Sequence, residues 1–190
     1  VFANKSYYRR KWTPDLKKIS FKHSFLNSNS VSFSSEKTIF NYTGLINIIS
    51  DFSPGIVISN GFTISTIKIL LMKPIKKYRV IIWSGAIDRY RIKISFLRKF
   101  LRKLIVKKTD RFIVYGTKAK EYIYNLGAPK EKIFISFNTV DIRSYPTKNF
   151  YQCQKSKINI LFVGYLTKGK NIESIFPLVK KISKNYSIEL

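Results

Sequence analysis

Short apolar runs with strand character alternate with a helical segment between residues 110 and 173, and this alternation constrains the fold more than any other feature. Residues 111–115 (RFIVY) and 132–137 (KIFISF) are two such runs, and residues 118–126 between them have helical character. After a polar gap, residues 158–163 (INILFV) form another apolar run. Strands that alternate with helices are typical of parallel sheets. The sequence therefore predicts the α/β class.

Upstream residues extend the same pattern. Residues 56–59 (IVIS) and 80–83 (VIIW) predict two further buried strands. Thr63 is a candidate N-cap for a helix that runs through Met72 and stops at Pro74.

Other segments are less regular. The apolar residues of 39–49 recur at helical spacing, and residues 92–108 predict a long basic helix. Residues 1–38 are polar and basic, and we expect irregular structure with weak strands there.

A polar stretch at residues 143–157 predicts a linker, with a domain boundary near Tyr151. We therefore expect one domain over residues 1–151 and the start of another over residues 152–190. In the latter, residues 158–163 open a second sheet, and a helix (172–181) and a strand (187–190) follow. Because both ends interrupt this pattern, we expect the chain to be a fragment.

The net charge of +26 is extreme for 190 residues, and lysine supplies 27 of the 36 cationic residues. Part of this excess is explained by the bias of an AT-rich genome. Charge of this size nevertheless attracts anionic partners, whether lipid headgroups, nucleic acid or sugar phosphates. A single Cys and a single His exclude a disulfide framework and give no plausible zinc site. No apolar run approaches the roughly 18–20 residues that cross a bilayer.

Small or polar residues follow each predicted strand. These dipeptides are Asn60-Gly61, Ser84-Gly85, Gly116-Thr117, Asn138-Thr139 and Gly164-Tyr165. In open parallel sheets, ligands bind outside the carboxyl ends of the strands, where backbone N–H groups and helix N-termini attract anions. The alternative is that these residues simply form tight turns. Neither a Walker loop nor a dinucleotide-binding glycine motif is present.

The residues 95–108 carry cations between apolar positions. Arg98, Lys99, Arg102 and Lys103 accompany an apolar stripe at helical spacing. A basic amphipathic helix is typical of a membrane-surface element, whereas ordinary core packing with a solvated basic face is the alternative. We expect both, with the stripe packed on the sheet and the basic rim meeting anionic lipid.

Four motifs together resemble a known family. They are YGTKAKEY at 115–122, LGAPKEKI at 126–133, NTVD at 138–141 and FVGYLTKGK at 162–170. These residues resemble the interdomain segment of group 1 nucleotide-sugar glycosyltransferases, which have the two-domain GT-B fold. The resemblance covers about 60 residues well. It implies a Rossmann-like parallel sheet with helices on both faces in an acceptor-side domain (1–151), and a truncated donor-side Rossmann-like domain (152–190).

The resemblance also implies roles for individual residues. Gly164 and Lys170 match positions that hold the donor diphosphate, although Tyr165 stands where the family has an arginine. Asp88 is the candidate for orienting an acceptor hydroxyl, and Asp141 matches the turn between the domains. An exposed turn, a helix-start acid and a turn cap are the respective alternatives.

The activity implied by the resemblance is transfer of a sugar from a nucleotide diphosphate sugar to a lipid-linked or glycan acceptor. Such a transferase would work in polysaccharide or glycoconjugate synthesis, peripherally at the cytoplasmic face of the membrane, with no metal or other cofactor. The family's two glutamates would lie beyond Leu190, so we expect the fragment itself to be inactive. The alternative from another class is a non-catalytic basic protein that binds nucleic acid.

Overall fold

The computed structural model describes residues 20–34, 37–88, 95–139, 143, 157–164, 166 and 170–189. The chain divides into two compact units, Val1–Thr139 and Val140–Leu190. In the part of the chain that the structure describes, no helix is long and apolar enough to span a membrane.

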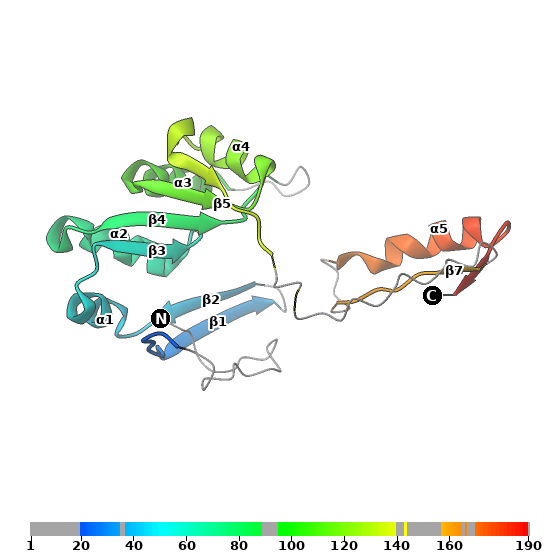
Figure 1. The fold of residues 1–190 in the computed structure, drawn as a ribbon, viewed down its shortest axis with the longest axis horizontal. Helices are drawn as coiled ribbons and strands as arrows, with labels where there is room; N and C mark the ends of the chain where they lie inside the picture. The colour runs from blue at the N-terminus through cyan, green and yellow to red at the C-terminus, as the bar shows by residue number, and fades with distance from the viewer. Residues whose placement is uncertain are drawn as a thin grey trace. The chain divides into compact units, whose positions relative to one another are not determined.

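The first unit combines an antiparallel strand pair with a parallel sheet and the helices that connect its strands. Its elements are β1 (Ser28–Ser34), β2 (Lys37–Tyr42), α1 (Leu45–Phe52), β3 (Ile56–Asn60), α2 (Ile64–Lys76), β4 (Arg79–Ser84), α3 (Phe96–Lys108), β5 (Arg111–Val114), α4 (Thr117–Asn125), the short 3₁₀ helix η2 (Lys130–Lys132) and β6 (Ile133–Ile135). The parallel sheet has the strand order β3-β4-β5-β6 (Figure 1). The predicted α/β class is therefore confirmed.

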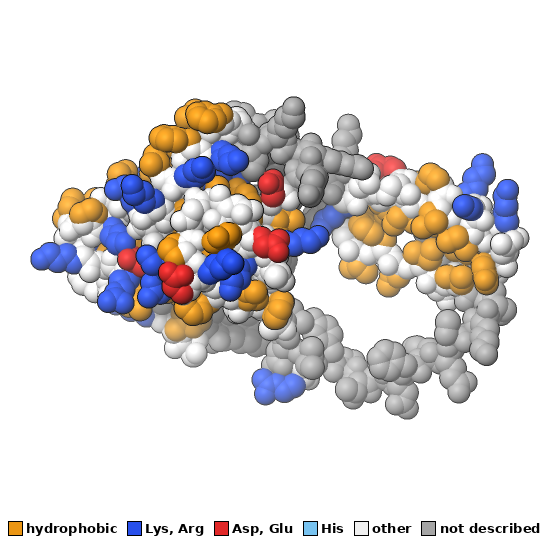
Figure 2. Space-filling view, turned by 90° about the horizontal axis from the view of Figure 1, so that it is seen from above, with side chains coloured by type: hydrophobic (Ala, Val, Ile, Leu, Met, Phe, Trp, Pro, Cys, Tyr) orange, Lys and Arg blue, Asp and Glu red, His pale blue; other side chains and the backbone are white. Residues whose placement is uncertain are grey.

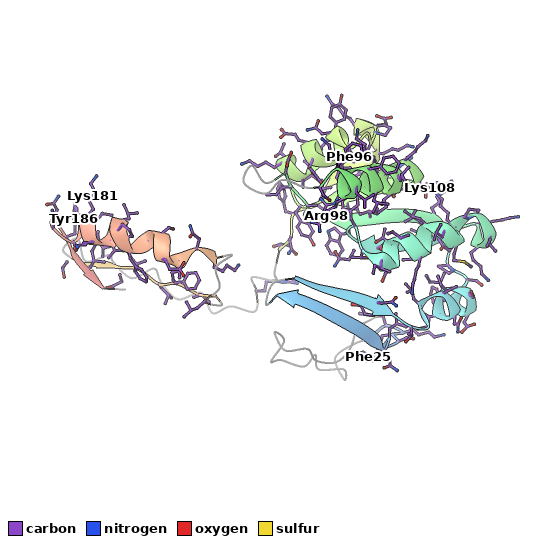
Figure 3. The ribbon with its side chains drawn as sticks, turned by 180° about the vertical axis from the view of Figure 1, so that it is seen from behind. Phe25, Phe96, Arg98, Lys108, Lys181 and Tyr186 are labelled. Carbon is purple, nitrogen blue, oxygen red and sulfur yellow. The ribbon has the colours of Figure 1, made fainter. Side chains whose placement is uncertain are left out.

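The helices that connect these strands cover one face of the sheet. Parallel strands that follow one another in sequence order, joined by right-handed crossovers, place every connecting helix on the same side. Burial agrees, because Val80 and Ile82 of β4 are fully buried while Trp83 is 42% exposed. The strands lie in front of α2 and α3 in Figure 1, and these helices lie in front in Figure 3. Helices were predicted on both faces of the sheet. Among the described residues, no helix that connects two strands of the sheet covers the other face.

The hydrophobic core lies between the sheet and the helix layer. Phe112 and Val114 of β5 and Ile123 of α4 are completely buried, as are Val80 and Ile82 of β4. Full burial of one such side chain contributes about 1.5–3 kcal/mol. The two middle strands therefore anchor the unit, and they fix the position of the loops that follow them.

The helix predicted from the spacing of residues 39–49 is wrong in its first half. Residues 37–42 form β2, which pairs with β1 through Val31 and Ile39. Gly44 then adopts a left-handed conformation with φ of 74°, and α1 begins at Leu45. Antiparallel pairing with β1, the strand that directly precedes β2 in the sequence, overrides the local helical spacing at these positions.

Two predicted helix ends also differ. Pro74 does not stop α2, because the helix continues to Lys76 and the Lys77 N–H still bonds to the Lys73 carbonyl at 2.9 Å. A proline in the last turn removes one backbone hydrogen bond and leaves the others in place. The long basic helix begins at Phe96, and Ser95, which was predicted to be helical, is its N-cap. The predicted positions 92–94 lie outside the described residues.

The second unit contains β7 (Lys157–Asn159), the 3₁₀ helix η5 (Ile172–Ser174), α5 (Ile175–Ile182) and β8 (Ser187–Glu189). β7 and β8 pair in parallel in a sheet of their own, so this unit is a strand–helix–strand element. α5 has no buried residue, and Leu161 and Val163 are 87% and 84% exposed. The described residues of this unit therefore form no hydrophobic core.

Candidate functional site

The carboxyl ends of β3, β4 and β5 bring three of the predicted dipeptides together. Asn60 is paired with Trp83, and Ser84 with Val114, so Gly61, Gly85 and Gly116 follow the strands at nearly the same level. The Gly61 N–H donates to the Trp83 carbonyl at 2.9 Å, which ties the first two loops together. We call the residues that follow β3, β4, β5 and β6 the carboxyl edge.

The remaining predicted residues of this edge lie farther out. β6 ends at Ile135, so Asn138 and Thr139 follow it by three and four residues, and both are exposed. Asp88 is exposed, four residues after the end of β4. Asp141 lies outside the described residues.

The start of α2 is fixed by a hydroxyl network. Thr63 is the N-cap, as predicted, and its Oγ1 accepts from the Thr66 N–H at 3.2 Å. The fully buried Thr66 hydroxyl donates to the Gly61 carbonyl at 2.7 Å and lies 2.7 Å from the Ser59 hydroxyl. Hydroxyls that bond one another and the backbone hold the Gly61 turn in one conformation.

By comparison, no side chain caps the start of α4. Gly116 occupies its N-cap position and has no side chain to accept from the first-turn N–H groups. These N–H groups have no partner within the helix, and the helix dipole adds partial positive charge at this end. The start of α4 can therefore receive an anion such as a phosphate.

An aromatic pair, which sequence reasoning missed, lies beside these loops. The rings of Trp83 and Tyr115 pack edge to face, with 6.0 Å between the ring centres. Trp83 is 42% exposed and Tyr115 is 37% exposed. The Tyr115 ring lies so close to Gly85 that a Cβ on Gly85 would be 2.4 Å from its Cδ2 atom. Exposed aromatic rings beside polar backbone groups are typical of small-molecule sites. The available signal was that these two residues end the predicted strands 80–83 and 111–115, whose counterparts β4 and β5 are neighbours in the sheet.

The cations of α3 have different environments. Arg98, Lys99 and Lys103 are exposed. The guanidinium of Arg102 instead donates to the Tyr122 hydroxyl and lies 5.1 Å from the centre of the Phe62 ring. Arg102 therefore bridges α4 and the loop after Gly61, and it is directed into the unit. The prediction that the whole apolar stripe packs on the sheet is wrong, because within α3 only Ile105 and Val106 are buried.

Two ionisable groups in this unit have shifted pKa values. Burial alone would raise the pKa of Asp110, but hydrogen bonds from Lys73 at 2.7 Å and from the Val80 N–H at 2.6 Å, with the nearby charge of Arg79, outweigh burial and lower it. Burial raises the pKa of Tyr78, whose hydroxyl donates to the Ile69 carbonyl at 2.5 Å. Both groups lie at the amino end of β4, away from the carboxyl edge, so their roles are structural.

The predicted donor-binding residues lie in the second unit. Gly164 and Lys170 are exposed, and a Cβ on Gly164 would be 3.1 Å from the Phe162 ring. Tyr165 lies outside the described residues. Gly164 and Lys170 belong to the second unit, whereas the carboxyl edge belongs to the first.

Among the described residues, no group of three or more His, Cys, Asp or Glu side chains can hold a metal ion. A pocket of about 440 Å³ lies toward the amino end of β3, where His23, Asp51, Phe52 and Ile56 contribute to its walls. This pocket is at the opposite end of β3 from the carboxyl edge, and it contains none of the predicted site residues.

Comparison with known proteins gives no match to a protein family and none to a curated protein. The similar solved structures include two complexes of one protein. The crystal structure of Anabaena Alr3699/HepE in complex with UDP-glucose has a TM-score of 0.43 and 8% identity over 73% of this chain and 32% of that one. The structure of the same protein with UDP and glucose has a TM-score of 0.49 and 6% identity over 87% of this chain and 54% of that one. This chain thus spans about a third of the length of the first chain and about half of the length of the second. The functional proposal rests on the residues of this chain.

Proposed function

We propose that this chain is part of a glycosyltransferase that moves a sugar from a nucleotide diphosphate sugar to a lipid-linked or glycan acceptor. The observation that carries the proposal is the carboxyl edge. Three glycine-containing loops meet there, the open start of α4 presents N–H groups, and the rings of Trp83 and Tyr115 lie beside them. The four sequence motifs at residues 115–170 support the same class.

In this proposal the protein stabilises charge that moves during the reaction. The bond between the sugar C1 atom and the donor phosphate oxygen breaks, and the diphosphate leaves with increased negative charge. An acceptor hydroxyl forms the new bond to C1 and loses its proton, which the leaving diphosphate or solvent accepts. Asp88 is the candidate to orient that hydroxyl. N–H groups and cations that face the leaving diphosphate lower the barrier, and Lys170 is the candidate cation. We place the protein at the cytoplasmic face of a membrane, where a lipid-linked acceptor would be reached.

Gly116 offers a sharp test of the anion site. Gly116→Asp and Gly116→Asn both add a good N-cap to α4, and nothing lies within 4 Å of a Cβ at this position, so both variants should fold. The aspartate also adds a negative charge where the diphosphate is expected. We expect Gly116→Asp to weaken binding of UDP-glucose, GDP-mannose or inorganic diphosphate at least tenfold, and Gly116→Asn to bind like the parent.

Isothermal titration of the full chain, with melting temperatures as a folding control, measures this difference. Equal binding by the two variants would remove the α4 start from the site. Tight, salt-dependent RNA binding by a chain that binds none of the three anionic probes would favour the nucleic-acid class instead.

A further inference from the structure

The outward side of α3 is apolar. Only Ile105 and Val106 face the core, whereas the large apolar residues of the first two turns and beyond face solvent. Their exposed fractions are 86% for Phe96, 65% for Leu97, 49% for Phe100, 43% for Leu101 and 42% for Leu104. An ordinary surface helix places such residues against the core and polar residues outside. On α3, by contrast, most of the large apolar residues are exposed together with the lysines.

The outward side of α2 has the same character. Thr66, Ile69 and Leu70 are buried, and the opposite face carries residues at intervals of three and four. Those residues are Ile64 (39% exposed), Ile67 (37%), Leu71 (66%) and Ile75 (68%). Neither the sequence pattern nor the fold requires four large aliphatic residues on this face.

The two helices make one continuous surface. α2 and α3 contact each other over the same face of the sheet, and the Lys73 ammonium of α2 donates to the Lys108 carbonyl at the end of α3 at 3.0 Å. Figure 3 shows Phe96 and Lys108 at the two ends of α3. We call the outward residues of both helices the α2–α3 surface. An extended exposed apolar patch of this kind marks an interaction site.

Lysines follow the apolar residues along α3. Phe96, Phe100 and Leu104 recur every four residues, and so do Lys99, Lys103 and Lys107, so that two parallel rows lie side by side on the helix. All three lysines are exposed, and neither α2 nor α3 contains an Asp or Glu. Figure 2 shows hydrophobic and cationic side chains interspersed on the first unit. We propose that the α2–α3 surface docks onto an anionic lipid bilayer.

A bilayer fits this surface better than other partners do. The apolar row can enter the boundary between headgroups and acyl chains while the lysine stems reach the anionic headgroups. A nucleic-acid duplex would contact the lysines and leave Phe96 and Phe100 in water. A single strand could stack bases on these rings, but it would leave the aliphatic residues Leu71 and Ile75 of α2 in water. A second copy of the chain docked through the same surface would bring lysines against lysines, with no acidic residue from either helix to compensate. The inference rests on the membrane placement in the proposed function and names the surface that would provide it, but vesicle binding can be measured whether or not the chain has transferase activity.

Vesicle flotation of the full chain tests this proposal. We expect binding to vesicles of phosphatidylcholine and phosphatidylglycerol at 70:30, weak binding to phosphatidylcholine alone, and a decrease with salt. Phe96→Ser, Phe100→Ser and Leu104→Ser together should lower binding at least tenfold. The matched control is Ile56→Thr with Ile58→Thr, which removes aliphatic residues that are 57% and 58% exposed on β3, and it should bind like the parent. Circular dichroism verifies the fold of each variant.

The charge test uses variants of equal net charge. Lys99→Gln, Lys103→Gln and Lys107→Gln together should weaken binding to the anionic vesicles about 100-fold. Replacing three exposed lysines elsewhere, Lys22, Lys118 and Lys130, by Gln should have a much smaller effect. Parent-like vesicle binding by the serine variant overturns the proposal. So does a dimer in sedimentation experiments that the serine variant dissociates while vesicle binding persists, or RNA binding that depends on the same lysines without vesicle binding.

Discussion

Asp110 connects three elements of the first unit through one carboxylate. Its Oδ2 accepts from Lys73 of α2 and from the Val80 N–H of β4, and its own N–H donates to the Val80 carbonyl at 3.0 Å. Lys73 also bonds the last carbonyl of α3 at 3.0 Å. The residue thus fixes the ends of two helices against the start of a central strand.

The lowered pKa of Asp110 predicts a pH-dependent contribution to stability. A carboxyl whose pKa is lower in the folded state stabilises the fold above its ordinary pKa of 3.8, and this contribution disappears as the pH falls through the folded-state pKa. We expect Asp110→Asn to cost about 1 kcal/mol at pH 7, which is about 2–4 °C in melting temperature. The difference in the free energy of unfolding between Asp110→Asn and the parent should become smaller as the pH falls from 5 to 3. Thermal unfolding followed by circular dichroism measures it, with the exposed Asp51→Asn as control; an equal difference at pH 7 and pH 3 would contradict the assignment.

At the residue scale, sequence predicts caps better than contacts between elements. Thr63 is recognisable as an N-cap because the cap and its N–H partner are three residues apart. The contact of Tyr115 with Gly85, and that of Arg102 with Phe62, depend on strand register and helix packing. A single sequence carries no direct signal of either, which is why the aromatic pair was missed and Arg102 was expected at the surface.

At the scale of single elements, α2 ends in a strained conformation. Its C-cap, Lys77, has φ of 55° and ψ of 28°, which is the left-handed region. A side chain with a Cβ pays a steric penalty there that glycine avoids, and glycine is the usual residue at such helix ends. The Lys77 N–H nevertheless closes the helix by bonding to the Lys73 carbonyl.

Replacing Lys77 by glycine should therefore stabilise the unit. We expect Lys77→Gly to raise the free energy of unfolding by roughly 0.5–1 kcal/mol, measured by urea denaturation at pH 7. The neighbouring Lys76→Gly is the matched control, since it removes the same charge from a residue inside the helix and should lower stability by about 1 kcal/mol. A loss of stability in both variants would show that relief of backbone strain is not the dominant effect.

The elements of the parallel sheet were predicted well because their signals are local. β3, β4 and β5 are short apolar runs, and each begins and ends within a residue or so of its predicted position. β2 was not predicted, because its strand conformation depends on pairing with β1. The outward apolar face of α3 could not be predicted either: helical spacing shows that a stripe exists, but not which way it faces.

At the scale of the whole chain, alternation of strands and helices was enough to predict the α/β class. It was not enough to predict that α2 and α3 lie on the same face of the sheet, which follows from the sequential strand order. Ile56 and Ile58 of β3 and Phe134 of β6 are 57%, 58% and 54% exposed as a result. The first unit therefore has apolar surface on both sides, on the strands and on the α2–α3 surface.

Burial is distributed unequally between the two units, and this predicts how they unfold. The described core residues, such as Val80, Phe112 and Ile123, all lie in the first unit, whereas the described residues of the second include none that is buried. Cooperative folding requires a buried core, and a short strand–helix–strand element rarely provides one. We expect residues 1–139 expressed alone to keep the circular dichroism spectrum and urea midpoint of the first unit in the full chain. Residues 140–190 alone should show no cooperative transition. A sharp urea transition in the isolated second segment, or loss of structure in the first when it is separated, would show instead that the stability of the two units is shared.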